Sequence, residues 1–384
     1  MVDKTLKNIG IDCRFWGIKH AGLGRYTRNL VLAILSQTNP QFRYTLFFQK
    51  GEWREDEKLL KNATIIEVSI PHYSLKEQTL LPGIVDEQKL ILMHYPHFNV
   101  PILAKTPFVV TIHDLIKHFF KGRPVTTRNT LLYWVKYGGY RVIISEAVRR
   151  AKHIITPSLF TKDQVSVHYP GSEKKTTIIY EGVAEEYVKS VKPEREVLKK
   201  YNLTAPFFVY TGSAYPSKNL PVLLNAFEAL KNKGKNVKLL IACARDAFWK
   251  KLEDEVKRRN IDKSVILPGK VPDSDLLALY QNAAAFIMPS LMEGFGLPGL
   301  EALSAGCPLI SSNAGSLPEI YEDAAFYFNP TNEAELVERM EEVLTLTADD
   351  KRVLSEKGQK QVDKYSWAKA AGQTVSIYSK VLQG

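Results

Sequence analysis

One segment constrains the fold of this chain more than any other. Between residues 283 and 312, an apolar run, a glycine-rich loop, a short helical stretch and a second apolar run follow one another. The apolar runs at residues 283–288 and 308–312 predict buried strands. Pro298 and Gly306 are typical of the start and the end of the helix between them. Such a unit predicts a parallel sheet covered by helices, with the loop at the carboxyl end of a strand, where open α/β sheets bind ligands.

Two glutamates in this segment are separated by seven residues: Glu293 lies in the loop and Glu301 in the expected first helical turn. Glycine lets a backbone approach a ligand closely, because it has no side chain. Amides at the start of a helix are donors for ligand oxygens. The segment therefore predicts a ligand-binding site built from carboxylates and backbone amides.

Short apolar runs alternate with helical stretches along the whole chain, and this predicts two α/β domains in 384 residues. We expect the domains at residues 1–190 and 191–365, a charged linker around residues 189–195, and a final helix at 366–384. A loop at residues 21–25 should precede a helix at 26–35. Strands are expected at residues 7–12, 44–48, 64–68, 90–93, 108–112, 153–156, 206–211, 238–243, 264–267, 283–288, 308–312 and 326–328.

The charge is distributed unevenly: residues 1–190 carry 27 Lys/Arg and 17 Asp/Glu, whereas residues 191–384 carry 25 and 24. A basic field attracts nucleic acid, an anionic membrane or an anionic substrate, or serves only solubility. We expect no nucleic-acid partner, because no zinc-finger, RRM or basic-region pattern occurs. Three distant cysteines fit no disulfide framework or zinc site, and no apolar stretch is long enough to span a membrane. Residues 1–8 lack a signal-peptide core, so we expect a cytoplasmic protein.

Several segments together resemble glycosyltransferase family 4. Residues 289–302 (PSLMEGFGLPGLEA) are similar to the family's signature of two spaced glutamates, and they carry the most specific part of the resemblance. Weaker similarities to the family's glycine-rich loop, its histidine-bearing strand end, its phosphate loop and further positions lie at residues 21–27, 111–114, 210–213 with 218–220, 267–271 and 317–319. The whole pattern most resembles the mannosyltransferase-like branch that builds bacterial surface polysaccharides.

The resemblance implies a GT-B fold: two Rossmann-like α/β domains that face each other across a cleft, with the C-terminal helix crossing back to the N-terminal, acceptor-binding domain. It implies transfer of a hexose from a nucleotide-sugar with retention of anomeric configuration, without metal or another cofactor. Mannose from GDP-mannose is the expected donor. The expected acceptor is a glycan or a lipid-linked sugar in surface polysaccharide synthesis, and an anionic membrane at the inner membrane face is a further candidate partner.

The resemblance also implies roles for individual residues. Lys218 would bind the departing diphosphate as a point charge, and the developing charge makes this a catalytic contact. Glu293 would hydrogen-bond a hydroxyl of the donor sugar, and His113 would contact that sugar near the reacting carbon. Glu301 would bind both ribose hydroxyls through its two oxygens. The other expected donor-binding residues are Gly22, Ser213, Gly294, Phe295, Gly296 and Leu297.

Two departures and several plainer interpretations stay open. Many relatives carry Arg where Ser213 stands, so one phosphate contact is in doubt, and Pro268 leaves the base preference open. Lys218 is otherwise a turn residue, Gly22 part of a tight turn, and His113 a structural histidine. The two glutamates are otherwise ordinary surface carboxylates.

The alternative functions are a non-catalytic nucleotide-sugar-binding relative and a GT-B sugar-nucleotide epimerase. A dinucleotide-dependent dehydrogenase is disfavoured, because the glycine-rich segment lacks a third glycine and Gln49 stands where a ribose-binding acid is expected. Pro96 disfavours a metal site at His94 and His97, since it prevents a regular helical face.

Residues 126–152 mix Lys and Arg with four aromatic residues. An interfacial membrane segment has this composition, and it would suit a lipid-linked acceptor. The equally weighted alternative is an amphipathic helix that faces the core.

Overall fold

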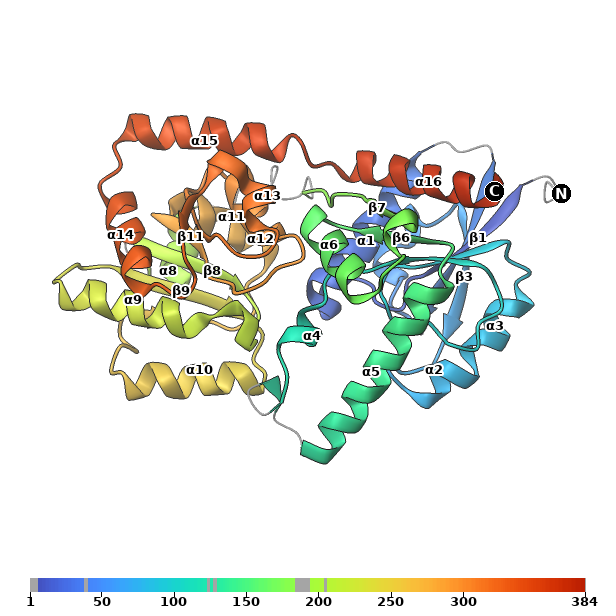
Figure 1. Ribbon diagram of the computed structural model, residues 1–384. Helices are drawn as coiled ribbons and strands as arrows, with labels where there is room; N and C mark the ends of the chain where they lie inside the picture. The colour runs from blue at the N-terminus through green and yellow to red at the C-terminus, as the bar shows by residue number, and fades with distance from the viewer. Residues whose placement is uncertain are drawn as a thin grey trace. The chain divides into compact units, whose positions relative to one another are not determined.

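The computed structural model describes residues 6–37, 41–122, 125–126, 130–183, 194–203 and 206–383. These residues form two compact α/β units (Figure 1). The first is drawn from Met1–Leu115, Asn129–Gly182 and Ser366–Gly384, and the second from Ile116–Arg128 and Val183–Tyr365. Most of the linker expected at residues 189–195 lies outside the described residues, which resume with α8 (Glu194–Lys200).

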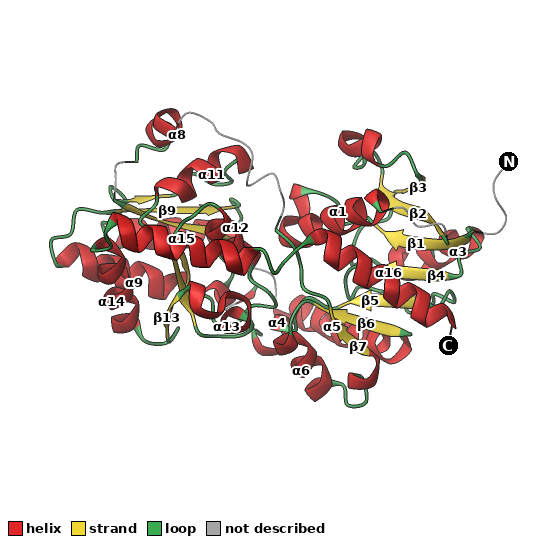
Figure 2. Ribbon diagram, turned by 90° about the horizontal axis from the view of Figure 1, so that it is seen from above, coloured by secondary structure: helices red, strands yellow, loops and turns green. Residues whose placement is uncertain are grey.

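The first unit is built on a parallel sheet, whose seven described strands run in the order β3-β2-β1-β4-β5-β6-β7 (Figure 2). This order reverses direction between β1 and β4, which makes that pair the topological switch point of the sheet. The strands are β1 (Lys7–Asp12), β2 (Phe42–Gln49), β3 (Ala63–Val68), β4 (Leu92–Tyr95), β5 (Phe108–Thr111), β6 (His153–Thr156) and β7 (Thr176–Ile178).

The second unit repeats the plan with six described parallel strands in the order β10-β9-β8-β11-β12-β13. Its switch point therefore lies between β8 and β11, the strand that leads into the Glu293 loop. The strands are β8 (Phe207–Gly212), β9 (Lys238–Cys243), β10 (Val265–Ile266), β11 (Ala285–Met288), β12 (Leu309–Ser312) and β13 (Phe326–Phe328).

Helices cover both faces of each sheet, and each face has its own apolar core. Strand residues therefore read as nearly continuous apolar runs, since alternate side chains enter opposite cores. In β2, for example, Leu46 and Phe48 pack on one face and Phe47 on the other. The helices of the first unit are α1 (Ala21–Ser36), α2 (Leu75–Thr79), α3 (Leu81–Glu87), α5 (Thr130–Arg150), α6 (Leu159–His168) and α16 (Trp367–Gln383). Those of the second are α4 (Ile116–Phe119), α8, α9 (Leu220–Asn232), α10 (Ala247–Arg258), α11 (Asp273–Asn282), α12 (Leu297–Ser304), α13 (Leu317–Tyr321), α14 (Glu333–Leu344) and α15 (Ala348–Val362).

The predicted return of the last helix to the first unit is confirmed. Helix α15 belongs to the second unit, whereas α16 packs on α1 and contributes Trp367 and Tyr378 to a core of the first unit. The hydroxyl of Tyr378 lies 2.6 Å from His94 Nδ1, and Thr111 Oγ1 lies 3.0 Å from His94 Nε2. Burial lowers the pKa of His94 to about 3, so this histidine is neutral and structural.

Two local predictions were wrong. Residues 21–25 form the first turn of α1 and not a loop, because Gly24 packs against the carbonyl oxygen of Gly17 and so begins the helix early. Helix α12 begins at Leu297, which places Glu301 just beyond its first turn. Strand β7 and helix α15 were not predicted at all.

Candidate functional site

Two of the predicted catalytic residues of the second unit form an ion pair. Lys218 Nζ lies 2.6 Å from Glu293 Oε1, and the same oxygen accepts a 2.5 Å hydrogen bond from Ser290 Oγ. The side chains of Lys218 and Glu293 are 22% and 9% exposed, so the pair is shielded but reachable from solvent. Because Lys218 follows β8 and Glu293 follows β11, the pair lies at the switch point of the sheet.

The Lys218 turn is held by its neighbour Asn219. Asn219 adopts the left-handed conformation (φ 55°), and its amide Nδ2 donates to the carbonyl oxygens of Pro289 and Pro330 at 3.1 and 2.8 Å. The backbone amide of Leu291 in turn donates to the Ser217 carbonyl at 2.8 Å. These bonds tie the loop after β8 to the loop after β11, so the Lys218 ammonium group is preorganised.

Ser316 fixes the other side of the Glu293 loop. Its hydroxyl is placed to donate to the carbonyl oxygens of Glu293 and Phe295 at 3.1 and 3.0 Å, and its backbone amide donates to Glu293 at 3.3 Å. Phe295 is only 4% exposed and packs edge-on against Tyr365. The loop therefore presents Glu293 from a rigid frame.

The glycines of this loop serve the packing of Tyr321 rather than only the approach of a ligand. Gly296 has a φ of +110°, and a Cβ there would lie 2.5 Å from the Tyr321 hydroxyl oxygen. A Cβ on Gly299 would overlap the same oxygen. That hydroxyl donates to the Gly296 carbonyl at 2.6 Å and so fixes the start of α12. The conformation leaves no side-chain cap on α12, whose first amides begin at Leu297.

Two predicted donor-binding residues differ in exposure. Glu301, on the second turn of α12, is 5% exposed, so a ligand would reach its carboxylate through a small surface. Ser213 is exposed just after β8, and its carbonyl oxygen accepts a 2.7 Å hydrogen bond from the Tyr210 hydroxyl. Gly294 is buried beside Glu293.

His113 follows β5 in the first unit. Its Nδ1 lies 3.2 Å from Glu181 Oε1 and its Nε2 lies 2.9 Å from the Pro96 carbonyl oxygen. Both partners only accept, so both bonds form fully when the imidazole carries two protons. Burial opposes that charge, but the hydrogen bonds that His113 donates to Glu181 and to the Pro96 carbonyl, together with the nearby carboxylate charges, outweigh it and raise the pKa of His113. The structure thus favours a cationic His113.

The two glycines of the first helical turn differ in what surrounds them. A Cβ on Gly24 would overlap the Gly17 carbonyl oxygen, whereas a Cβ on Gly22 would meet nothing within 4 Å. Gly24 is therefore required by packing. Gly22 is exposed at the uncapped N-terminus of α1, with open space in front of its backbone.

We did not predict from the sequence that Ser290, Ser316 and Glu181 support the site. Each acts through an atom brought near by the fold, over a separation of 3 to 68 residues. Glu181, directly after the short strand β7, is 5% exposed. The burial of Glu181 is what marks it as a support, and the burial of a single glutamate cannot be predicted from the sequence.

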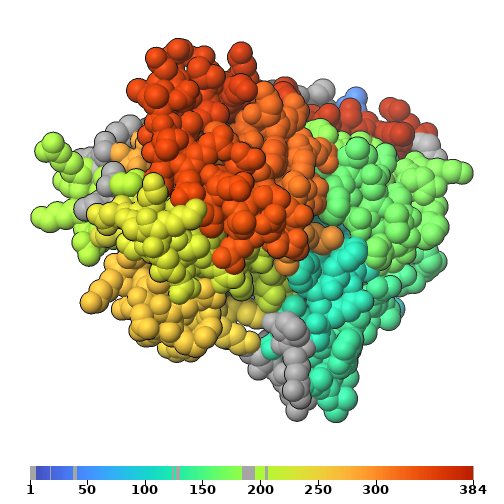
Figure 3. All heavy atoms as spheres, turned by 60° about the vertical axis from the view of Figure 1, so that its left-hand side comes forward, coloured from blue at the N-terminus to red at the C-terminus, as the bar shows by residue number. Residues whose placement is uncertain are grey.

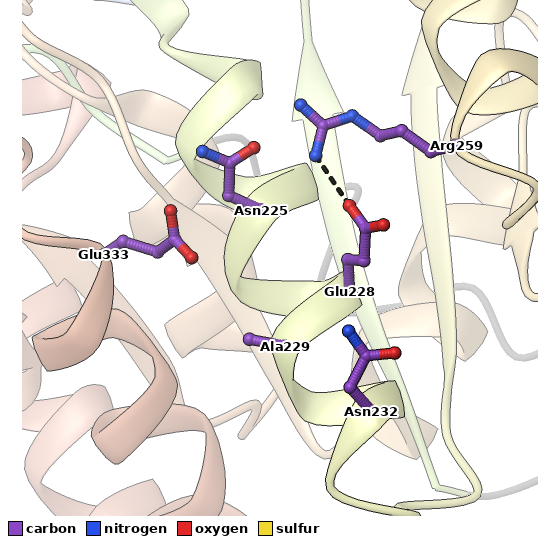
Figure 4. Close-up of a pocket in the computed structure, with 6 residues that line it drawn as sticks. All are labelled: Asn225, Glu228, Ala229, Asn232, Arg259 and Glu333. Carbon is purple, nitrogen blue, oxygen red and sulfur yellow. Dashed lines mark hydrogen bonds and ion pairs between the residues drawn. The ribbon is translucent and has the colours of Figure 1, made fainter.

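An open depression of about 350 Å³ lies elsewhere in the second unit, along α9 (Figure 4). Arg259 and Glu228 pair across part of it at 2.9 Å. Its lining residues are Asn225, Glu228, Ala229, Asn232, Arg259 and Glu333. None of them is a predicted site residue, and we assign the depression no part in the chemistry.

Among the described residues, no group of three or more His, Cys, Asp and Glu is arranged to hold a metal ion, and no described helix is both long and apolar enough to cross a bilayer.

Comparison with known proteins bears on the family of this chain. Residues 21–187 match the family Glycosyltransferase Family 4, and residues 193–361 match the family Glycosyl transferases group 1. O-antigen chain mannosyltransferase B of Escherichia coli is 29% identical over 303 residues, which cover 76% of this chain and 75% of that protein. O-antigen chain mannosyltransferase RfbU of Salmonella typhimurium is 27% identical over 241 residues, which cover 62% of this chain and 60% of that protein.

Solved structures share the fold. A glycosyltransferase from Rickettsia africae superposes with a TM-score of 0.74 at 16% identity, over 99% of both chains. WaaG, a glycosyltransferase involved in lipopolysaccharide biosynthesis, gives a TM-score of 0.73 at 16% identity, over 96% of this chain and 99% of that one. HepE from Anabaena, in complex with UDP and glucose, gives 0.74 at 16% identity, over 97% of this chain and 99% of that one. The predicted architecture of two Rossmann-like domains is confirmed.

Proposed function

This chain belongs to glycosyltransferase family 4 and is a glycosyltransferase, and we propose that it transfers mannose from GDP-mannose to a glycan or lipid-linked acceptor in the synthesis of a surface polysaccharide. The Lys218–Glu293 pair at the β8/β11 switch point carries the proposal. The choice of mannose is supported by the relatives, which are O-antigen chain mannosyltransferases. Retention of configuration and independence from metal rest on the family resemblance alone.

The pair suggests how donor binding rearranges the site. A diphosphate oxygen would replace Glu293 as the partner of the Lys218 ammonium group. The released Glu293 oxygen would then accept a hydrogen bond from a sugar hydroxyl, while Ser290 keeps the carboxylate in place. The contact between Lys218 and Glu293 is thus replaced by two charge-assisted contacts with the donor, one from Lys218 to the diphosphate and one from the sugar hydroxyl to Glu293.

The proposed reaction breaks the bond between the anomeric carbon and the phosphate oxygen and forms a bond from that carbon to the acceptor oxygen. The acceptor proton passes to an oxygen of the departing phosphate, on the same face of the sugar. Lys218 stabilises the negative charge that develops on the diphosphate, which is where a fixed cation lowers the barrier most. Cationic His113 would be a second positive group near the sugar, held by Glu181.

Nucleotide release from GDP-, UDP- and ADP-sugars tests the proposal. We expect release from GDP-mannose that depends on an acceptor, and a fall of about 10²–10³ in kcat for Lys218→Ala. Lys233→Ala is the matched control, because Lys233 forms an exposed pair with Glu341 in the same unit. Unchanged transfer in both Lys218→Ala and Glu293→Ala would refute the site.

The same assay separates the alternatives. A non-catalytic relative would bind nucleotide-sugars without turnover, and an epimerase would consume the donor without an acceptor. Release from another nucleotide-sugar alone would replace the donor named here while leaving the transferase intact.

We further propose that the enzyme works in the cytoplasm at an anionic membrane, through the first half of α5. The second half of this helix packs normally, with Tyr140, Ile144 and Val148 buried. In the first half, Leu131, Trp134 and Val135 are 75%, 47% and 65% exposed, so a helix that faces the core along its whole length is ruled out. Figure 1 shows α5 extending past the sheet, and in Figure 3 the blue-green atoms of its first turns are exposed at the lower edge.

The charge around this helix favours a lipid partner over another protein. Residues 116–145 carry six Lys/Arg and no Asp/Glu. Tyr133, Trp134 and Tyr137 lie in mutual contact, with ring centroids 5.2–6.1 Å apart. Amphipathic aromatic rings beside cations are typical of a segment at the level of lipid headgroups.

Sedimentation with vesicles of phosphatidylcholine and phosphatidylglycerol at low salt tests this part. Trp134→Ser with Val135→Ser should abolish co-sedimentation, whereas Val353→Ser, at an exposed apolar position of the second unit, should not. Wild-type protein that stays in the supernatant would refute membrane binding and would leave the transferase proposal untouched.

A further inference from the structure

A buried ion network lies at the switch point of the first unit. Arg14 is fully buried just after β1, and it donates to both carboxylate oxygens of Asp12, at 2.8 and 2.6 Å. Its Nη2 also lies 2.7 Å from Glu77 Oε1. Burying three charged groups carries a desolvation cost that their pairing need not repay, so the network calls for an explanation beyond stability.

What the network holds is the backbone of Tyr73. The second oxygen of Glu77 accepts hydrogen bonds from the Tyr73 amide at 2.8 Å and from Asn99 Nδ2 at 2.7 Å. Tyr73 has a φ of 55°, a conformation that costs a non-glycine residue roughly 1–2 kcal/mol. Tyr73 is nevertheless 54% exposed, so the strained conformation does not serve to bury its ring. Tyr73 is thus strained, held through its backbone and half-exposed, and strain of this kind is typical of functional sites.

A cluster of rings surrounds Tyr73 at the carboxyl ends of β1 and β4. Phe15 stacks on His72 with centroids 3.8 Å apart and planes 19° apart. The Tyr73 ring lies 6.0 Å from Phe15 and 6.1 Å from His97. Burial lowers the pKa of His72 to about 4, so this imidazole is uncharged at neutral pH. Phe15, His72 and Tyr73 thus contribute flat, uncharged rings to this cluster.

The ring cluster is connected to His113. Pro96, the residue before His97, accepts the hydrogen bond from His113 Nε2 at 2.9 Å. The loop after β4 therefore joins the rings to the residue that the proposed function places near the reacting carbon. An acceptor must approach that carbon, and in this unit the exposed ring next to the loop is Tyr73.

We propose that Tyr73 is the platform on which a pyranose ring of the acceptor stacks, and that the Asp12–Arg14–Glu77 network positions it. The inference rests on the proposed glycosyl transfer and names the residue that recognises its second substrate. An aromatic face suits the apolar C–H face of a sugar. One guanidinium group against two carboxylates gives no excess positive charge, so the site favours a neutral saccharide over an anionic ligand.

Two substitutions of Tyr73 separate recognition from structure. Tyr73→Gly removes the ring but adopts a φ of 55° without strain, so the loop keeps its conformation. Tyr73→Phe keeps the ring and loses only the hydroxyl group. Leu75→Ala is the matched control, because Leu75 is 84% exposed two residues away.

The assay measures nucleotide release at saturating donor against the concentration of methyl α-D-mannopyranoside, with the gluco and galacto analogues as further probes. We expect Tyr73→Gly to raise the KM for the preferred probe about three- to tenfold, the range of a lost ring contact. The KM for the donor and donor hydrolysis without acceptor should stay unchanged, and Tyr73→Phe and Leu75→Ala should match wild type.

Saturation-transfer NMR with the same pyranosides gives a readout that needs no turnover. Transfer to a probe in wild type and its loss in Tyr73→Gly would support the platform. No transfer to any probe in wild type, equal transfer in Tyr73→Gly, or an equal rise in the donor KM would overturn it. Absence of nucleotide release from every donor would instead refute the proposed function.

Discussion

The Lys218–Glu293 pair leads to a quantitative prediction about the stability of the second unit. Lys218→Met removes the cation from a carboxylate that is only 9% exposed. Breaking a fully buried pair costs about 3–5 kcal/mol, and an exposed pair contributes about 0–1 kcal/mol. Lys218 is 22% exposed and Ser290 still donates to Glu293, so we expect an intermediate cost of about 2 kcal/mol.

The assay is thermal unfolding of the single variants and of the double variant with Glu293→Gln. For a unit of roughly 200 residues, about 2 kcal/mol lowers Tm by about 4–8 °C. Glu293→Gln should cost less, because the amide keeps the Ser290 hydrogen bond and the remaining Lys218 is partly hydrated. The double variant should be more stable than the sum of the single losses predicts, by about 1–2 kcal/mol.

Two outcomes would refute this reasoning. Lys233→Met breaks an exposed pair and should change stability by less than about 0.5 kcal/mol. If Lys218→Met shifts Tm no more than Lys233→Met does, the burial of the pair has no energetic consequence. If the losses of the double variant are strictly additive, the 2.6 Å contact is not an interaction in solution.

Three further predictions follow from the first unit. Gly24→Ala should destabilise the protein by about 3 kcal/mol or more, because the added methyl group would overlap the Gly17 carbonyl oxygen. Gly22→Ala should leave thermal stability unchanged or raise it by up to about 1 kcal/mol, but should weaken GDP binding measured by calorimetry. Equal effects of the two substitutions would contradict the difference in their surroundings. Glu181→Gln should lower the pKa of His113 in an NMR titration. Because the folded pKa of His113 is raised, the stabilisation by Glu181 is fully present below the ordinary pKa of about 6.5 and is lost as pH rises through the raised value. The difference in Tm between this variant and wild type should therefore shrink at high pH, and a difference independent of pH would contradict the prediction. Tyr378→Phe removes the hydroxyl group next to His94 and should lower the free energy of unfolding in urea by about 1 kcal/mol or more. Tyr180→Phe, at an exposed position, should change it little.

Much of the fold follows from residue pattern alone. In a doubly wound sheet nearly every strand is buried on both faces, so the strands are apolar runs such as residues 207–212 and 238–243, which are hard to mistake. Strand β7 was missed because Thr176–Ile178 is short and largely polar. The first turn of α1 was missed because two glycines disfavour a helix locally, and packing of Gly24 overrides that preference.

The sequence predicts candidate site residues but not their geometry. The loop around Glu293 has an informative local pattern, since its glycines accompany the helix start. Its contact with Lys218 joins positions 75 residues apart, and that contact depends on β8 and β11 being neighbours. The clash that makes Gly299 necessary involves Tyr321, which only the folded chain brings near.

The docking of α16 on the first sheet has a consequence for synthesis on the ribosome. Trp367, Ala371 and Tyr378 belong to a core that otherwise draws on residues 9–179. A nascent chain therefore exposes this apolar surface while the whole second unit is being translated. The second unit, in contrast, has its described elements complete by Tyr365 and can fold first. The first unit is therefore the last to be finished, and its exposed apolar surface is prone to aggregation in the interval.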